Sequence, residues 1–196
     1  MPHEVFDVHV ERYDRWFDDH RATYLEELKI LMRLPEAQGA DLEVGVGTGR
    51  FAAPLGIRLG LDPSLPMLLI ARARGIETVR GVAEAQPFRN GSMKSVLVMT
   101  SLCYFDDPAK AFQEIHRVLS PGGRVVIGFL GRGGEIAERY RKTRERGTFL
   151  AHATFYMPGE VISMLSGAGF TGTREQNTGN ASAKGFHVVT ATRPGR

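Results

Sequence analysis

Apolar residues recur at helical spacing in the first 35 positions of the chain, and polar residues fill the positions between them. Two apolar faces follow this spacing: Val10, Tyr13, Trp16 and Phe17, then Tyr24, Leu25, Leu28, Leu31 and Met32. Pro35 ends the second periodic stretch, and Asp18 or Asp19 is placed to cap its start. The chain is therefore predicted to open with two amphipathic helices.

From residue 40 onward, short apolar runs alternate with helical patterns. Strands are predicted at 40–44, 57–61, 76–80, 95–99 and 124–129, and helices at 50–55, 64–74 and 108–119. The helix at 64–74 has Pro66 in its first turn and Gly75 just past its end, as helices commonly do. This alternation predicts an α/β fold with a doubly wound, mostly parallel sheet.

The pattern changes near the end of the chain. A helix is predicted at 158–167, followed by strands at 170–176 and 186–193 that have a polar, glycine-containing loop between them. Two consecutive strands without an intervening helix predict an antiparallel hairpin at one end of the sheet.

Composition limits the class of protein. With 196 residues, 42% hydrophobic and 24% charged, the chain is expected to form one globular domain. Cys103 is the single cysteine, which excludes an internal disulfide and a thiolate zinc cluster. The start lacks a signal-peptide pattern, and no apolar run approaches the length of a membrane span. A cytoplasmic protein is expected.

Charge is distributed unevenly, although the net charge is only +3. Residues 1–27 carry eight acidic and three basic side chains, whereas residues 131–147 carry three acidic and six basic ones. The second segment has the spacing of a basic amphipathic helix with flanking glycines, either a solvated surface helix or a lid that attracts an anionic substrate or the acidic arm. We expect the acidic arm (1–27) and the basic lid (131–147) to meet above the active site. The small net charge does not favour a nucleic-acid partner.

The strongest chemical signal is a glycine loop after the first predicted strand. Glycines occupy positions 45, 47 and 49, and Asp62 ends the next strand. The G-x-G-x-G spacing differs from the G-x-G-x-x-G of dinucleotide sites, and no Lys-Ser/Thr pair follows as in a P-loop. A purely structural turn is the alternative, but Glu43 before the loop and Asp62, a ribose-binding type of carboxylate, favour a ligand site.

Several segments together resemble the class I S-adenosylmethionine-dependent methyltransferases. The resemblance is carried, in the family's order, by the motifs Leu42-Glu-Val-Gly-Val-Gly-Thr-Gly-Arg50, Leu61-Asp-Pro-Ser64, Gly81-Val-Ala-Glu-Ala-Gln-Pro-Phe88, Leu102-Cys-Tyr-Phe-Asp-Asp-Pro108 and Glu114-Ile-His-Arg-Val-Leu-Ser-Pro-Gly-Gly123. It covers roughly residues 38–130 and is similar to the small single-domain branch that includes quinone-biosynthesis methyltransferases. It implies a Rossmann-like, seven-stranded sheet of order 3-2-1-4-5-7-6 with the seventh strand antiparallel.

The resemblance also implies a set of cofactor contacts for S-adenosylmethionine and its product S-adenosylhomocysteine. The implied residues are Glu43, Gly45, Gly47, Gly49, Asp62, Pro63, Ser64, Met67, Ala83, Glu84, Thr100 and Ser101. Glu43 would orient the ammonium group and Asp62 the ribose. The family usually has an acid where this chain has Val82, so Glu84 is a candidate to contact the adenine amino group instead.

The acceptor side is expected to come from the arm, the strand ends and the lid. The candidate residues are Tyr13, Trp16, Tyr24, Tyr104, Phe129, Arg132 and Tyr140, with His152 as a candidate general base. The aromatic residues of the arm could equally be core, and His152 could be structural or solvated. Cys103 is interpreted as a small apolar filler rather than a nucleophile.

These observations predict a single domain that uses S-adenosylmethionine to methylate a small molecule by in-line displacement. Its parts would be an N-terminal helical arm (1–37), a cofactor-binding core (38–130), a lid (131–157) and a C-terminal helix with a hairpin (158–196). The alternatives are a nicotinamide-dependent oxidoreductase and a non-catalytic S-adenosylmethionine-binding protein. No metal is required, since methyl transfer from sulfonium depends chiefly on alignment of the reactants.

Overall fold

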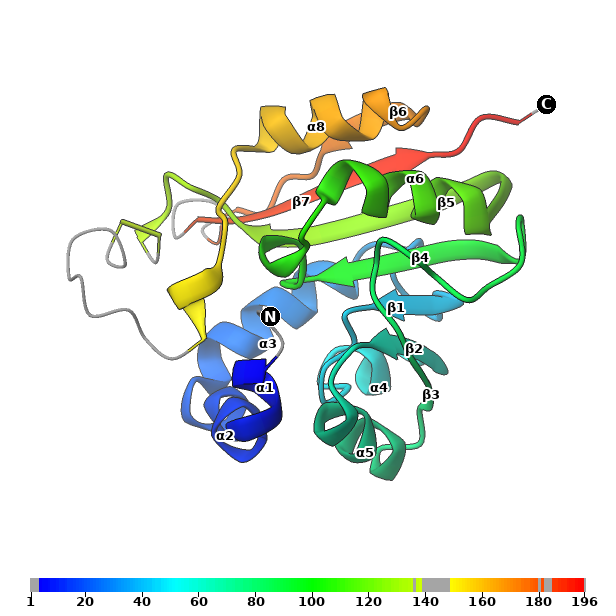
Figure 1. Ribbon diagram of the computed structural model, residues 1–196. Coiled ribbons are helices and arrows are strands. Elements are labelled where there is room, and N and C mark those ends of the chain that lie inside the picture. Colours follow the sequence, from blue (N-terminus) through cyan, green and yellow to red (C-terminus); the bar gives the residue numbers. More distant parts are fainter. Residues whose placement is uncertain (1–3, 136, 139–148, 180, 182–184, 196) are drawn as a thin grey trace.

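A computed structural model describes residues 4–135, 137–138, 149–179, 181 and 185–195. These residues form one seven-stranded sheet in the order β3-β2-β1-β4-β5-β7-β6 (Figure 1). The strands are β1 (Leu42–Val44), β2 (Leu59–Asp62), β3 (Glu77–Arg80), β4 (Met93–Met99), β5 (Leu119–Leu130), β6 (Thr171–Glu175) and β7 (Phe186–Thr192). The predicted order is confirmed.

Strand direction follows the connections. β1 to β5 are parallel, because each connection returns the chain to the same end of the sheet. β7 runs antiparallel to both β5 and β6. The terminal hairpin predicted from two consecutive strands is therefore present, and β7 occupies the position between β5 and β6.

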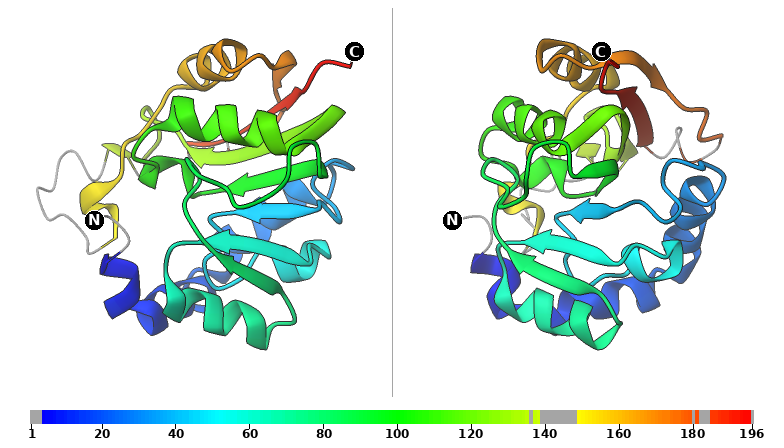
Figure 2. Two further views of the ribbon diagram at one scale, coloured as in Figure 1. Left: turned by 45° about the vertical axis from the view of Figure 1, so that its right-hand side comes forward. Right: turned by 90° about the vertical axis from the view of Figure 1, so that its right-hand side faces the viewer.

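Helices cover both faces of the sheet (Figure 2). One face carries α3 (Arg21–Leu31), α4 (Ala52–Leu55) and α5 (Leu65–Ala73), and the other carries α6 (Pro108–Val118) and α8 (Pro158–Gly167). Two further helices, α1 (Glu4–Val8) and α2 (Val10–Asp19), lie near the carboxyl ends of the strands, as do the short 3-10 helices η1 (Leu102–Tyr104) and η2 (Leu150–His152) (Figure 1).

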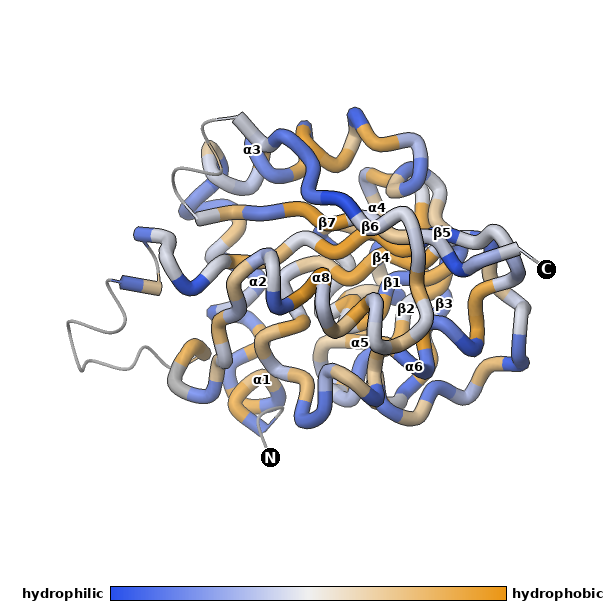
Figure 3. The backbone as a smooth tube through the Cα atoms, turned by 90° about the horizontal axis from the view of Figure 1, so that it is seen from above, coloured by the Kyte–Doolittle hydropathy of each residue, from blue (hydrophilic) through white to orange (hydrophobic). Residues whose placement is uncertain are grey.

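The apolar core is divided by the sheet into two clusters. Phe112 and Ile115 of α6 are fully buried with Leu165 of α8 on one face, and Leu31 of α3 is buried with Leu68 of α5 on the other. Full burial of such a side chain contributes roughly 1.5–3 kcal/mol. In Figure 3, apolar segments accordingly follow the central strands, and hydrophilic segments concentrate at the outer turns. The core fixes the strand ends that carry the site.

Some sequence-based expectations differ from the structure. The short helix α1 was not predicted, and the residue at the start of α3 is His20 rather than Asp18 or Asp19. β5 begins at Leu119, directly after α6, instead of at residue 124. In the predicted basic helix, residues 135, 137 and 138 are helical, and Tyr140 with most of that segment lies outside the described residues.

Among the described residues, no helix is long and apolar enough to cross a membrane.

Candidate active site

A cavity opens at the carboxyl ends of the parallel strands, where open α/β sheets bind ligands. Most of the predicted cofactor residues line it: Gly45, Gly47, Asp62, Pro63, Met67, Ala83, Glu84, Thr100 and Ser101. They come from the turns after β1, β2, β3 and β4, which bring together segments spread over nearly sixty positions of the sequence. Three other predicted residues, Glu43, Gly49 and Ser64, do not line the cavity.

Gly45 of the glycine loop lies too close to a neighbouring side chain to carry one itself. Gly45 has φ +74°, and a Cβ added there would lie 2.3 Å from the Cβ of Ser101. Gly47 has φ +51°, and its missing side chain would point toward Tyr13, with the hydroxyl oxygen 3.5 Å from an added Cβ. The loop needs glycine both for its left-handed backbone and for the space above it.

Asp62 is held rigidly at the end of β2. Its Oδ2 accepts a hydrogen bond from the Gly47 N–H, and its Oδ1 accepts one from the Ser64 N–H, both at 2.9 Å. Ser64 is the N-cap of α5, so the helix start and the glycine loop together orient one carboxylate. The remaining lone pairs of both oxygens can accept hydroxyl groups of a ribose.

Glu43 lies beneath the loop, buried within β1. Its Oε2 is buried and has no hydrogen-bond partner among the described residues. Burial, and then the nearby charge of Asp62, raise the pKa of Glu43 well above its usual range. A buried carboxyl oxygen without a partner is costly in an empty site, and a ligand ammonium group bound above it would compensate that cost, directly or through water.

Thr100 occupies a strained position at the end of β4. Its φ is +51°, and it is the one non-glycine residue with positive φ in the described part of the chain. A β-branched residue rarely adopts this conformation, and such strain concentrates at functional sites. The Thr100 N–H donates to the Gly128 carbonyl at 2.8 Å, which holds the turn beside the cavity.

Aromatic rings close the cavity from above. Phe6 of α1 contacts Tyr104 of η1, Tyr13 of α2 and Phe149, with ring centroids 4.9, 5.6 and 5.4 Å away. Tyr13 also contacts Phe149, at 5.7 Å. Figure 1 shows η2, which follows Phe149, beside α1. The arm therefore meets the segment around residue 149 through aromatic contacts, whereas most of the basic segment 131–147 lies outside the described residues.

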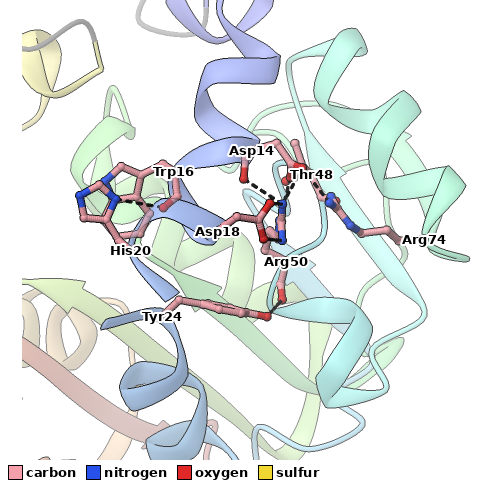
Figure 4. A network of polar contacts seen from close by, with 8 residues as sticks. All are labelled: Asp14, Trp16, Asp18, His20, Tyr24, Thr48, Arg50 and Arg74. Atoms are coloured by element: carbon pink, nitrogen blue, oxygen red, sulfur yellow. Dashed lines mark hydrogen bonds and ion pairs between the residues drawn. The ribbon is translucent and has the colours of Figure 1, made fainter. Parts of the chain in front are cut away.

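Two acidic residues of the arm bind the core. Asp14 and Asp18 of α2 accept hydrogen bonds from the Arg50 guanidinium at 2.8–2.9 Å, and Arg74 donates to Asp14 at 2.8 Å (Figure 4). Arg50 follows the glycine loop directly, and Arg74 also donates to the Thr48 carbonyl within it. This network, which we call the arm latch, joins the aromatic cover to the loop beneath it.

The arm latch is expected to depend on the charge of Asp14. Burial alone would raise the pKa of Asp14, but its hydrogen bonds with Arg50 and Arg74 outweigh burial and lower it. Ionised Asp14 therefore stabilises the folded state fully at pH values above its pKa in the unfolded chain, which is near 4. This stabilisation is lost as the pH falls through the lower pKa of Asp14 in the folded protein. Asp14→Asn should therefore lower the free energy of unfolding by about 1–2 kcal/mol at pH 7 and by much less at acidic pH.

Denaturant titrations at pH 7 and at acidic pH measure the change in the free energy of unfolding. Unfolding is followed by the fluorescence of the single tryptophan, Trp16 of α2. Asp19→Asn, an exposed acid of the same helix, is the control and should change little. An equal loss for the two variants at pH 7 would show that the latch contributes nothing.

The structure places several predicted acceptor residues away from the cavity. His152 is exposed, Arg132 pairs with Glu160 at 2.7 Å, and Trp16 is exposed and stacked on His20 (Figure 4). Tyr24 donates its hydroxyl to the Arg50 carbonyl at 2.7 Å, and Phe129 is buried in the sheet core. Of the acceptor candidates among the described residues, only Tyr13 and Tyr104 line the cavity.

Three features were missed by the sequence analysis: Phe6, Phe149 and the pairing of Asp14 with Arg50. Nothing in local spacing connects residues separated by 36 or more positions. An available signal was Arg50 itself, a charged residue directly after a glycine loop, in a chain whose arm has an excess of acids.

Comparison with known proteins identifies the family of the chain. Residues 42–127 match the family model described as a methyltransferase domain. A solved S-adenosylmethionine-dependent methyltransferase from Thermotoga maritima, described as a possible histamine N-methyltransferase, is 32% identical; the match covers 98% of this chain and 100% of that one, with a TM-score of 0.89. The chain belongs to the class I S-adenosylmethionine-dependent methyltransferase family.

Two curated relatives extend the comparison. An uncharacterized protein of Methanocaldococcus jannaschii is 37% identical over 175 residues, covering 89% of this chain and 84% of that protein. The demethylmenaquinone methyltransferase of Thermus thermophilus is 37% identical over 108 residues, covering 49% of each chain. The match thus covers most of both chains for the first relative and about half of each chain for the second.

Proposed function

We propose that this protein transfers the methyl group of S-adenosylmethionine to a small-molecule acceptor. The observation that carries the proposal is the convergence of the glycine loop and the oriented Asp62 carboxylate at one cavity, with the unpartnered Glu43 oxygen buried in the strand that leads into the loop. These groups match the amino acid and ribose parts of the cofactor. The rings of Phe6, Tyr13 and Tyr104 line the same cavity and would surround the acceptor.

Each part of the chain has a defined task in this proposal. The glycine loop gives the methionyl part close access to the backbone, Asp62 holds the ribose, and Met67 and Ala83 line the adenine region. When bound, the cofactor supplies an electrophilic methyl group, which the acceptor's lone pair attacks in line while the carbon–sulfur electron pair stays on sulfur. The arm excludes water and aligns the acceptor, and alignment of this kind is worth about 7–11 kcal/mol of a barrier.

Isothermal titration calorimetry tests the proposed ligand. S-adenosylmethionine and S-adenosylhomocysteine should bind with micromolar-scale affinity, and NAD should not bind. Binding of NAD alone would favour the oxidoreductase alternative. Binding of S-adenosylmethionine without turnover of any acceptor in a metabolite extract containing labelled cofactor would favour a non-catalytic binding protein.

Asp62→Asn tests the ribose contact. The change keeps the size of the side chain but removes the charge that strengthens its hydrogen bonds, so cofactor affinity should fall by about 1–3 kcal/mol. Calorimetry with S-adenosylhomocysteine measures the loss. Glu77→Gln, an exposed change on neighbouring β3, should leave the affinity unchanged. An unaltered affinity of the Asp62 variant would place the ribose elsewhere.

A further inference from the structure

In the proposed function, the aromatic part of the cavity receives the acceptor, and the carboxylates of Asp62 and Glu84 belong to the proposed ribose and adenine contacts. Of the described residues that line the cavity, none is lysine, arginine or histidine. Arg132, one of the residues predicted on the acceptor side, is paired with Glu160 outside the cavity. An anionic acceptor would therefore find no cation to pair with among the described lining residues.

The same end is walled by aromatic rings. Phe6, Tyr13 and Tyr104 line the cavity, and Phe149 packs behind Phe6 with a centroid distance of 5.4 Å. The rings meet mostly edge to face, with interplanar angles of 84° for Phe6 with Tyr13 and with Tyr104. Ring faces consequently point in different directions around one space, and a cation near such faces is attracted by the ring quadrupoles.

Tyr13, Cys103 and His152 are poorly suited to remove a proton from the acceptor. Burial, and then the charges of Asp62 and Glu43, raise the pKa of Tyr13, so its hydroxyl stays neutral. Burial raises the pKa of the Cys103 thiol to about 12, and His152 is exposed outside the cavity. A phenol or alcohol acceptor needs a base, but the free-base form of an amine already offers its lone pair.

We infer that the acceptor is an amine, held with its nitrogen among Phe6, Tyr13 and Tyr104. This inference rests on the proposed methyltransferase function and adds the substrate class. The nitrogen lone pair forms the new bond to carbon, the nitrogen becomes an ammonium, and solvent removes any proton that it then releases. The positive charge develops where ring faces favour it and where none of the described lining residues opposes it.

A pair of probes that differ only in charge tests this assignment. Choline carries a trimethylammonium group, and 3,3-dimethyl-1-butanol is its neutral isostere with carbon in place of nitrogen. Their affinities for the protein saturated with S-adenosylhomocysteine are measured by saturation-transfer NMR titration. Choline should bind at least about fivefold more tightly than the neutral isostere. The anionic analogue 3,3-dimethylbutanoate should bind most weakly.

Variants assign the preference to the aromatic cluster. Phe6→Leu should remove most of the preference for choline, because leucine keeps apolar contact but lacks a ring face, and Phe6→Tyr should retain it. Tyr104→Leu repeats the test from another element, in case one change disturbs the arm. Val8→Ala, at an exposed position of the same helix α1, is the matched control and should not alter the preference.

The outcomes separate this inference from the proposed function. Equal binding of choline and its neutral isostere, or tightest binding of the anion, would overturn the amine assignment even if S-adenosylhomocysteine binds normally. A choline preference that survives Phe6→Leu and Tyr104→Leu would also overturn it. Failure of S-adenosylhomocysteine to bind would contradict the proposed function. Choline and its neutral isostere, titrated in the absence of S-adenosylhomocysteine, would still show whether the aromatic rings prefer a cation.

Discussion

Gly45→Ala is expected to destabilise the protein and to close the cofactor site at the same time. The left-handed backbone at φ +74° costs a side-chain-bearing residue about 1–2 kcal/mol. The new methyl group would also lie 2.3 Å from the Cβ of Ser101, which cannot move without shifting the backbone after β4. Overpacking of this kind costs about 1–3 kcal/mol, so the free energy of unfolding should fall by about 2–5 kcal/mol in total.

Two further variants separate the causes of that loss. Gly56→Ala introduces the same left-handed strain at φ +73° with no atom within 4 Å, and should cost only about 1–2 kcal/mol. Combining Gly45→Ala with Ser101→Gly removes the overlap, so the two changes should cost less together than the sum of their separate effects. Denaturant titration measures stability, and calorimetry should show at least about a tenfold loss of S-adenosylhomocysteine affinity for Gly45→Ala alone. Additive effects would rule out the overlap as the cause.

Glu27→Gln is expected to stabilise the protein strongly at alkaline pH. Glu27 is buried in α3, and burial, with a smaller effect of the neighbouring Glu26 charge, raises its pKa to about 8 from an ordinary value of 4.5. Between these values, the folded state keeps a proton that the unfolded state has lost. The free energy of unfolding therefore decreases as the pH rises from about 4.5 to 8.

Glutamine resembles the protonated carboxyl group, so the variant should lack this decrease. It should be more stable than the natural chain by about 3–5 kcal/mol at pH 8 and nearly equal to it at pH 4.5. Denaturant titrations at the two pH values measure the difference. Glu11→Gln, at an exposed acid of α2, is the control and should show no such pH dependence. A pH-independent effect of Glu27→Gln would mean that Glu27 is ionised in the folded state.

The cofactor half of the cavity was predictable because its residues lie at the ends of strands. Apolar runs located β1, β2 and β4, and the residues just past each run, Gly45, Asp62 and Thr100, had to converge at one edge of a parallel sheet. Whether Gly49 and Ser64 face the cavity was not predictable in the same way. That depends on the path of each turn, and Ser64 turns inward to cap α5.

The acceptor half was predicted poorly for a related reason. Aromatic residues at helical spacing identify an apolar face but not its partner, so Trp16 and Tyr24 could not be distinguished from Tyr13. The structure packs the partly buried Tyr13 above Gly47 and leaves Trp16 at the surface. Phe6 lies in a helix of five residues, too short for periodicity to detect.

The sequence by itself determined the alternation of strands and helices, the terminal hairpin and the position of the glycine loop, because these depend on local periodicity and on turn chemistry. The family and the strand order followed from the resemblance of several motifs that occur in the family's order. Only the tertiary structure decided which charges pair and which rings meet. Asp14 and Arg50 are 36 positions apart, and Phe6 and Phe149 are 143 positions apart. Side chains that are distant in the sequence meet their partners only when the chain folds. Folding pairs Asp14 of the arm with Arg50 of the core. It also leaves a cavity whose described lining carries no cation.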